Sequence, residues 1–298
     1  MKKIYDGSLV GKPSWSSNFV VFSSDGVYIY NLKDDALNVV SSFGSYPVIS
    51  PDSLFVAYKN TNEGGVFVYS VESRNSSILT DDTSDTPAVW LKVPTDLLIF
   101  KSDGTDLGEG AGERQFVARV DTVTKSIKEY TSVSRGRFFD AVSLGDESVL
   151  VSGGFDDGRS DYILNVKNDT AVTLHKNVSV SEVLIDVFSR NVFVYSQNTV
   201  TPYNYLGEKM TPLTLQNPPD VDMVKETPLG FNVNEKNVWL SDVSGKPLRS
   251  TIRQWNFLTG EFVKEDVSED GVVTFFSETS LYAVPSEDGA SVQFTILN

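Results

Sequence analysis

Short apolar runs, each bounded by polar turn residues, recur along the whole chain. The runs are built from Val, Ile, Leu, Phe and Tyr, and the residues between them are mostly Gly, Asp, Asn, Ser and Pro. This pattern is typical of strands joined by turns, because branched and aromatic side chains fit a pleated surface and the flanking residues favour chain reversal. Helical periodicity is scarce. The pattern therefore predicts an all-β fold.

One of these runs is the clearest copy of a repeated unit. A small polar residue followed by about four apolar ones, as in "SLFVAY", occurs seven times, starting at Asn18, Ser53, Asp96, Ser148, Asn191, Asn237 and Ser280. The starting positions are 35, 43, 52, 43, 46 and 43 residues apart. Each copy follows a polar turn, and each of the first six precedes a loop and two further apolar runs. A unit of about 44 residues with four strands predicts the blade of a β-propeller.

The repeat predicts a single domain with seven antiparallel four-stranded blades. The blades are expected at about residues 13–43, 44–81, 86–132, 137–175, 181–215, 221–267 and 271–298. The seventh unit lacks a fourth strand, and we expect residues 2–8 to supply it by pairing with the last strand. This closure would leave no free sheet edge in the ring. A six-bladed ring with a damaged extra unit remains the alternative.

Two segments resemble known propeller repeats. "ISPDSLFVAY" (residues 49–58) resembles the Ser-Pro-Asp-Gly hairpin of WD40-like and TolB-type repeats, with Ser53 where those repeats usually have glycine. Residues 149–166, with Gly153 and Gly154 after an apolar run, resemble a kelch repeat. Each resemblance covers one blade and implies a propeller. Propellers carry enzymes, lectins, scaffolds and virion parts, so the resemblance does not name a function.

Composition and charge remove several classes of function. The 298 residues include no cysteine, which excludes disulfides, thiolate metal sites and cysteine nucleophiles. A formal net charge of −15 repels phosphate backbones, so we expect no nucleic-acid partner, and a basic protein surface or a divalent cation fits better. Neither a signal peptide nor a long apolar segment is evident, so no membrane insertion is expected. A cytoplasmic or virion-associated protein is predicted.

Acidic residues gather on one predicted face of the propeller. If the strands of a blade are named a to d in chain order, the long b–c loops and the d–a loops share a face, and long loops on a rigid scaffold commonly carry binding sites. Ten acidic residues lie on three neighbouring loops there: Asp81, Asp82, Asp85, Asp103, Asp106, Glu109, Glu113, Asp156, Asp157 and Asp161.

This acidic set has three interpretations that the sequence leaves open. It could be a dock for a basic partner. It could hold Ca²⁺, for which Asp103, Asp106 and Asp156 are weak candidates because calcium prefers oxygen ligands. It could also be a set of solvated loops in which Asp side chains cap their own backbone in Asx turns.

Catalytic patterns are poorly represented. The single histidine, His175, lies near the end of a predicted fourth strand, and no Gly-x-Ser-x-Gly nucleophile motif occurs. One histidine without cysteine cannot supply a typical zinc site. The glycine-rich residues 108–113 precede a predicted strand rather than a helix and contain two glutamates, which would repel phosphate. We therefore expect no enzymatic activity and no cofactor other than calcium.

These observations favour a non-catalytic structural or protein-interaction propeller. We expect a subunit of a larger assembly, for which a bacteriophage or other virion component is a concrete candidate. The alternative is a carbohydrate-binding or glycoside-processing propeller that uses acidic residues of the loop face, since glycosidases work with paired carboxylates.

Overall fold

The computed structural model of the chain consists of β-strands and turns, and no helix occurs among the residues that it describes. Contacts group the chain into two compact units, residues Leu9–Ser179 and residues Met1–Ser8 with Val180–Asn298. The structure describes residues 2–5, 7, 10–108, 112–145, 147–155, 158–176, 182–186, 191–196, 199–214, 226–232, 237–244, 249–256, 259, 261–268, 274–276, 281–285 and 292–296.

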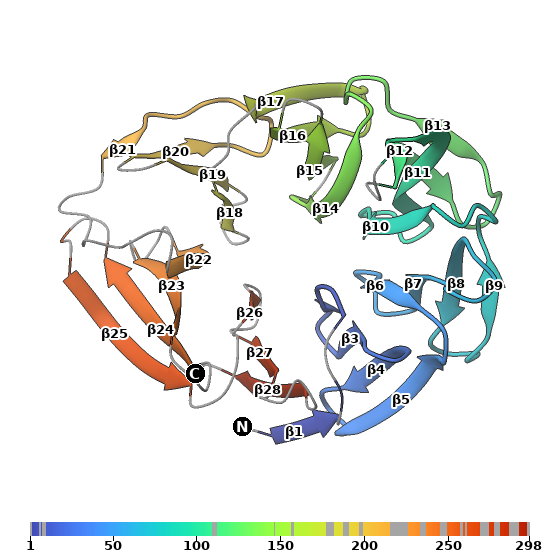
Figure 1. Cartoon of the computed structure of the whole chain (residues 1–298), viewed down its shortest axis with the longest axis horizontal. Helices are drawn as coiled ribbons and strands as arrows, with labels where there is room; N and C mark the ends of the chain where they lie inside the picture. Colours follow the sequence, from blue (N-terminus) through green and yellow to red (C-terminus); the bar gives the residue numbers. More distant parts are fainter. Residues whose placement is uncertain are drawn as a thin grey trace. The chain divides into compact units, whose positions relative to one another are not determined.

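The unit Leu9–Ser179 contains four antiparallel sheets of four strands, each with its strands in chain order (Figure 1). The first is β2 (Ser14–Trp15), β3 (Phe19–Ser23), β4 (Val27–Asn31) and β5 (Ala36–Ser41). The second is β6 (Ser45–Ile49), β7 (Phe55–Lys59), β8 (Val66–Ser70) and β9 (Ser76–Ile78). The third is β10 (Thr86–Trp90), β11 (Asp96–Asp106), β12 (Glu113–Asp121) and β13 (Ile127–Glu129). The fourth is β14 (Arg137–Ser143), β15 (Ser148–Phe155), β16 (Gly158–Asn165) and β17 (Thr170–Lys176).

The other unit contains three four-stranded sheets among its described residues. The first is β18 (Glu182–Asp186), β19 (Asn191–Ser196), β20 (Thr199–Tyr203) and β21 (Leu213–Thr214). The second is β22 (Glu226–Asn232), β23 (Asn237–Ser244), β24 (Arg249–Asn256) and β25 (Glu261–Ser268). The third is β26 (Thr274–Phe276), β27 (Leu281–Pro285), β28 (Val292–Ile296) and β1 (Lys2–Tyr5).

The third sheet of that unit is completed by the start of the chain. Its strand order is β1-β28-β27-β26, and Lys2 lies opposite Phe294 in an antiparallel pair. The predicted pairing of the N-terminal segment with the last strand is confirmed. The paired strand is shorter than the predicted segment and ends at Tyr5.

The middle strands are continuous apolar runs because they are covered on both faces. Val20, Val21 and Phe22 follow one another in β3 and are each at most 1% exposed. A strand that lies between two neighbouring sheets buries successive side chains on opposite faces. It therefore lacks the alternation of apolar and polar residues that a half-exposed strand shows. Burying each such side chain contributes about 1.5–3 kcal/mol.

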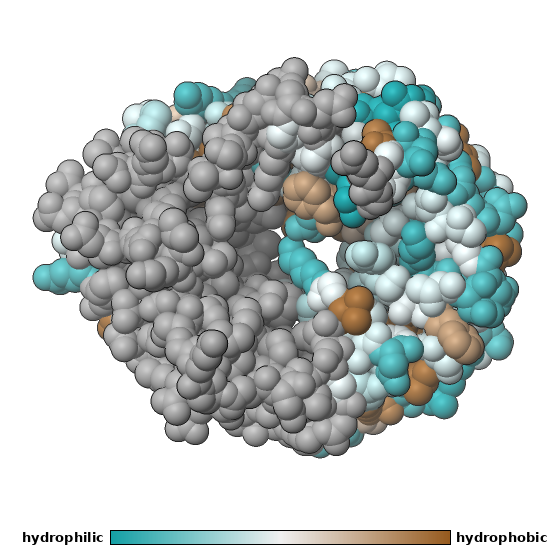
Figure 2. Space-filling view, viewed as in Figure 1, coloured by the Kyte–Doolittle hydropathy of each residue, from teal (hydrophilic) through white to brown (hydrophobic). Residues whose placement is uncertain are grey.

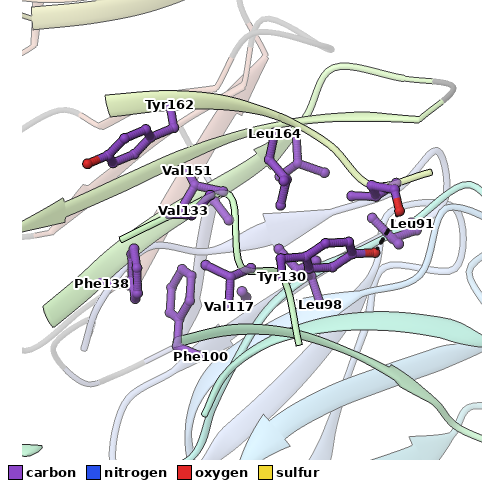
Figure 3. Packing of buried hydrophobic residues seen from close by; sticks show 14 residues of the cluster. Leu91, Leu98, Phe100, Val117, Tyr130, Val133, Phe138, Val151, Tyr162 and Leu164 are labelled. Atoms are coloured by element: carbon purple, nitrogen blue, oxygen red, sulfur yellow. Dashed lines mark hydrogen bonds between the residues drawn. The ribbon is translucent and has the colours of Figure 1, made fainter. Parts of the chain in front are cut away.

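The core of the unit Leu9–Ser179 fills the spaces between successive sheets. Between its third and fourth sheets, the rings of Phe100 and Phe138 stack with centroids 5.1 Å apart (Figure 3). Tyr130 is fully buried in the same cluster, and its hydroxyl donates to the Val166 carbonyl at 3.0 Å. Burial raises the pKa of Tyr130 to about 12, so this donor keeps its proton.

The Ser-Pro-Asp turn between β6 and β7 is followed by Ser53, where WD40-like and TolB-type repeats usually have glycine. Ser53 has a φ of +66°, a conformation that glycine adopts readily and other residues adopt at a cost. Its hydroxyl donates to Ser16 Oγ at 2.7 Å, which ties the turn to the preceding sheet. A buried hydrogen bond thus offsets the strain that glycine would avoid.

Candidate functional site: the β11–β12 hairpin

The third sheet carries a hairpin that is longer than its counterpart in the preceding sheet. β11 has 11 residues and β12 has 9, whereas β7 and β8 have 5 each. The two strands pair from Asp96 and Asp121 outward to Asp106 and Glu113. The prediction that Asp103, Asp106 and Glu113 lie on a loop was therefore wrong, because all three lie on the strands of this hairpin. Its polar residues form strand because they find their partners across the hairpin.

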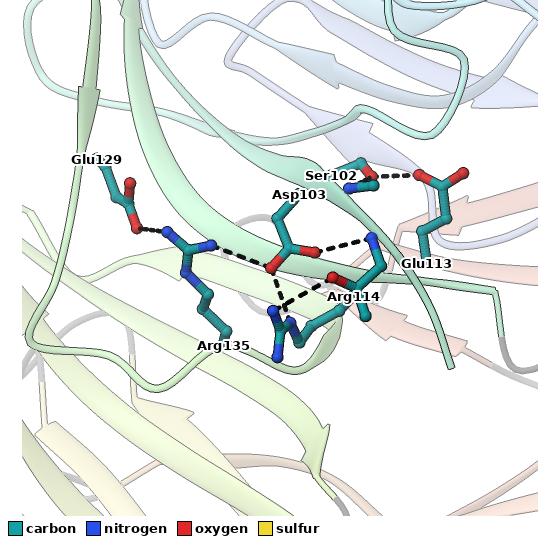
Figure 4. A network of polar contacts seen from close by, with 8 residues as sticks. Ser102, Asp103, Glu113, Arg114, Glu129 and Arg135 are labelled. Carbon is teal, nitrogen blue, oxygen red and sulfur yellow. Dashed lines mark hydrogen bonds and ion pairs between the residues drawn. The ribbon is translucent and has the colours of Figure 1, made fainter. Parts of the chain in front are cut away.

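Asp103 lies at the centre of an ionic network on this hairpin (Figure 4). Its Oδ2 accepts from Arg114 Nε at 2.7 Å and from Arg135 Nη1 at 3.0 Å, and its Oδ1 accepts from Thr105 N at 3.0 Å. Arg135 also donates to Glu129 Oε1 at 2.6 Å. The network joins β11, β12 and β13 to the segment that leads to the fourth sheet.

Local packing holds Arg135 in this position. Its guanidinium carbon lies 5.0 Å from the centroid of the Phe116 ring, within the range of a cation–π contact. Only 7% of the Asp103 side chain is exposed. Burial raises the pKa of Asp103, but the hydrogen bonds from Arg114, Thr105 and Arg135 outweigh it and hold the pKa well below its usual range. Asp103 is therefore ionised whenever the protein is folded near neutral pH.

A second set of polar contacts fixes the base of the hairpin. Asp85 is fully buried, and its carboxylate accepts from Lys101 Nζ at 3.0 Å and from Ser102 N at 3.0 Å. Burial raises the pKa of Asp85, and the bonds from Lys101, Ser102 and Thr80 oppose this effect. The Ser102 hydroxyl donates to Glu113 on the facing strand. The segment between β9 and β10 is thereby tied to both hairpin strands.

Lys59, at the end of β7, interacts electrostatically with nearby carboxylates, among them Asp85 and Glu113. Burial lowers the pKa of Lys59, and the charges of Asp85, Asp82 and Glu113 oppose that shift. This is the expected balance for an ammonium that is partly removed from water beside negative charges.

The predicted acidic residues do not form one set of free carboxylates. Asp85 and Asp103 are committed to Lys101 and to arginines, which corrects the expectation of a solvated acidic loop. Asp161 lies on β16 rather than in a loop, is fully buried, and accepts a hydrogen bond from the Ser152 hydroxyl. Charged groups at these positions are paired because an unpaired buried charge is strongly unfavourable.

Other predicted residues fit the Asx-turn interpretation. Asp82 Oδ1 accepts from Ser84 N at 2.9 Å, and Asp106 Oδ1 accepts from Gly108 N at 2.8 Å. Asp81 is exposed. Three of the predicted residues lie outside the described residues, namely Glu109, Asp156 and Asp157.

The described residues contain no group of three acidic or histidine side chains placed to hold a metal ion. Asp103, one of the calcium candidates, has two arginines where a cation would have to bind. Asp106 uses Oδ1 for its own turn, and the third candidate, Asp156, lies outside the described part. His175 belongs to β17, and its side chain is not among those described.

Sequence reasoning missed the residues that join the hairpin to its surroundings. Gln115 donates to the Ser84 carbonyl at 3.3 Å and accepts from Phe138 N at 3.2 Å, which links the β9–β10 connection to β14. Arg135 lies in a connection without apolar periodicity, 32 residues from Asp103. No pattern in a single sequence points to such a long-range polar contact.

Among the described residues, no helix has the length and apolar character needed to span a membrane. No protein-family model matches the sequence. No curated relative matches it either.

Several solved structures share this fold. The chain is similar to acylaminoacyl peptidase of Pyrococcus horikoshii, with 14% identity, a TM-score of 0.64, and coverage of 98% of this chain and 51% of that one. It is similar to the β-propeller domain of the Trilobed protease from Pyrococcus furiosus, with 15% identity, a TM-score of 0.62, and coverage of 98% and 96%. It is also similar to oligogalacturonate lyase of Vibrio parahaemolyticus, with 12% identity, a TM-score of 0.61, and coverage of 99% and 90%.

These similarities show the fold, which is a β-propeller of antiparallel four-stranded blades. The chain spans about half the length of the peptidase that it resembles. Identities of this size carry no information about activity, and proteins with different chemistry share the fold.

Proposed function

We propose that this β-propeller is a non-catalytic protein-interaction module and that the β11–β12 hairpin is the element that contacts the partner. The observation that carries the proposal is the length of the hairpin together with its ionic brace. β11 and β12 extend about twice as far as β7 and β8, and the Asp103 network holds the added part. A contact element that is already ordered loses little conformational entropy when it binds.

The described part of the hairpin tip presents both apolar and acidic side chains to solvent. Leu107 is 37% exposed, and residues 104–106 are exposed as well. Asp106 is exposed, and its Oδ1 accepts from Gly108 N at 2.8 Å, which leaves its other carboxylate oxygen for a partner. An exposed apolar side chain next to an exposed carboxylate suits a protein surface with a small apolar recess and a basic residue beside it.

The proposed context is a larger assembly, of which a virion particle is one candidate. The fold supports this in a general way, because a propeller presents many connections from a rigid scaffold. The seven sheets are proposed to be the blades of one ring, closed by the β1–β28 pair. Seven repeats in the sequence and an N-terminal strand within the last sheet support that arrangement.

The alternative of carbohydrate binding or processing receives less support from the described residues. It needs two solvent-facing carboxylates beside a sugar. Asp161 is buried and bound by Ser152 Oγ, and Asp156 lies outside the described part. The fold shared with oligogalacturonate lyase is compatible with this alternative and does not favour it.

The test compares the wild-type chain with a hairpin-tip variant in its native cells. A tagged chain is cross-linked and purified, and its bound proteins are quantified by mass spectrometry. The tip variant carries Asp106→Lys and Leu107→Ser. The matched control carries Glu72→Lys and Val123→Ser, which make the same chemical changes at exposed positions on other turns.

We expect the wild type and the control to co-purify with a partner in constant proportion. The amount of partner bound to the tip variant should fall at least about tenfold, since contact residues of this kind contribute ~1–2 kcal/mol each to binding. A wild-type chain recovered as a lone monomer would refute the interaction function. A partner that stays bound to the tip variant would refute the role of the hairpin alone.

A further inference from the structure

Two exposed aromatic residues are pushed out of the first strands of their sheets by irregularities in strand pairing. In β6 the register shifts between Ser45 and Val48, and Tyr46 within this shift has a φ of +52° and is 52% exposed. In β14 the register shifts between Phe138 and Asp140, and Phe139 within this shift is 55% exposed. Bulges of this kind redirect side chains and are frequent beside binding sites.

These two strands lie close together in the unit Leu9–Ser179. β10 contacts both β6 and β14, so a single strand separates the two that carry the exposed rings. Figure 2 shows isolated hydrophobic residues among hydrophilic ones on the face of the described part that is in view. Single exposed apolar residues are ordinary on protein surfaces. A binding site therefore requires a further group that connects the two rings.

The segment that precedes β2 supplies this connection. Val10 is fixed on β3, because its N donates to the Ser23 carbonyl at 2.8 Å. The backbone of Gly11 then passes the Tyr46 ring, since a Cβ on Gly11 would lie 3.9 Å from Cδ1 of that ring. Lys12 Nζ reaches Asp140 Oδ2 at 3.0 Å. The segment thus runs from the side of one exposed ring to the residue that follows the other.

The ion pair between Lys12 and Asp140 is accessible and easily exchanged. The Lys12 side chain is 55% exposed and the Asp140 side chain 40% exposed. Such pairs contribute little to stability, because each partner regains hydration when they separate. Another cation could take the place of Lys12 at Asp140 without an appreciable cost to the fold.

We propose that Asp140, Tyr46 and Phe139 form a docking surface for a basic protein segment and that Lys12 occupies the position of the partner's cation while the surface is free. The carboxylate of Asp140 would accept hydrogen bonds from an Arg or Lys side chain, and the exposed ring of Tyr46 would contact a neighbouring cationic or aromatic side chain. The chain's net charge of −15 attracts a basic segment despite the nearby Arg137. This surface is distinct from the hairpin tip, and either proposal can fail alone.

The experiment measures binding of short labelled peptides to the full chain by fluorescence anisotropy at low salt. The basic probe is Gly-Ser-Arg-Trp-Lys-Ser-Gly, and its charge-reversed counterpart has glutamate in place of Arg and Lys. The variants are Lys12→Met, Asp140→Asn and Tyr46→Ser, with Glu72→Gln as the matched control for loss of one exposed charge.

We expect the wild type to bind the basic probe and not the acidic one. Lys12→Met should tighten binding by about twofold to fivefold, because it removes the internal competitor. Asp140→Asn and Tyr46→Ser should each weaken it by about twofold to fivefold, and the control should leave it unchanged. Each variant is also measured with the acidic probe, because a misfolded chain exposes apolar surface and would take up both Trp-containing probes.

Three outcomes of the peptide experiment would overturn the inference. They are equal binding of the acidic probe, unchanged or weaker binding by Lys12→Met, and no binding of the basic probe at about 1 mM, the limit of a weak specific contact. Binding of cellohexaose in place of the peptide would also overturn it, since the surface would then be a carbohydrate site.

Discussion

The charge of Asp103 is predicted to hold the β11–β12 hairpin together. Asp103→Asn keeps the shape of the side chain and one acceptor oxygen, but it removes the negative charge that Arg114 and Arg135 share. A hydrogen bond to a charged group contributes about 1.5–3 kcal/mol and a neutral one about 1 kcal/mol. The stabilisation lost over the two hydrogen bonds is smaller than their full difference, because both arginines are about 40% exposed and can be rehydrated. We therefore expect Asp103→Asn to lower the free energy of unfolding by about 1–2 kcal/mol.

The pH dependence of this loss distinguishes charge from packing. The pKa of Asp103 is depressed in the folded protein, so its ionisation stabilises the fold above the unfolded-state pKa of about 4. That stabilisation decreases as the pH falls through the folded-state pKa. The stability difference between wild type and Asp103→Asn should therefore be full at pH 7 and smaller at pH 3.

Urea unfolding at several pH values measures the difference, and hydrogen exchange of residues 102–107 locates it. Arg135→Met, alone and combined with Asp103→Asn, completes a double-mutant cycle that isolates the pair. A difference below about 0.5 kcal/mol at pH 7 would show that the charge of Asp103 does not stabilise the fold, since surface substitutions without a specific contact have effects of that size. A loss that is the same at pH 3 as at pH 7 would assign the effect to packing instead of charge.

Two further predictions concern the scaffold. Deletion of residues 1–5 should lower the melting temperature by at least about 5 °C, because it removes β1 and leaves an edge of β28 unpaired, and an unchanged value would refute the closure. Asp85→Ala should lower the free energy of unfolding, measured in urea, by about 2–4 kcal/mol, since Lys101 loses its buried partner. Asp81→Ala at an exposed position should lower it by less than about 0.5 kcal/mol. Equal effects of the two substitutions would contradict the assigned roles.

The sequence predicted the fold better than it predicted the site, and the reason is physical. Strands such as β3 and β7 are apolar runs flanked by turn residues, so their formation is written in local sequence. The outer parts of β11 and β12 are polar and become strand only through pairing with each other. Sequence periodicity does not report such pairing, so this segment was predicted to be a loop.

The acidic residues illustrate the same limit from the side of electrostatics. Their number and proximity were visible in the sequence, but their partners were not. Arg135 neutralises Asp103 from a connection 32 residues away. Asp161 has an unremarkable local sequence, and its burial follows from its place on β16. A count of carboxylates therefore overstated the free negative charge of the predicted face.

The pairing of β1 with β28 has a consequence for how the chain reaches its folded state. Lys2 and Phe294 are separated by nearly the whole sequence, so their strand pair is among the slowest contacts to form. Until it forms, β28 keeps an open edge that can pair with a strand of another molecule. Aggregation during refolding should therefore depend on protein concentration, and a synthetic peptide with the sequence of residues 1–8, added in excess, should compete with it.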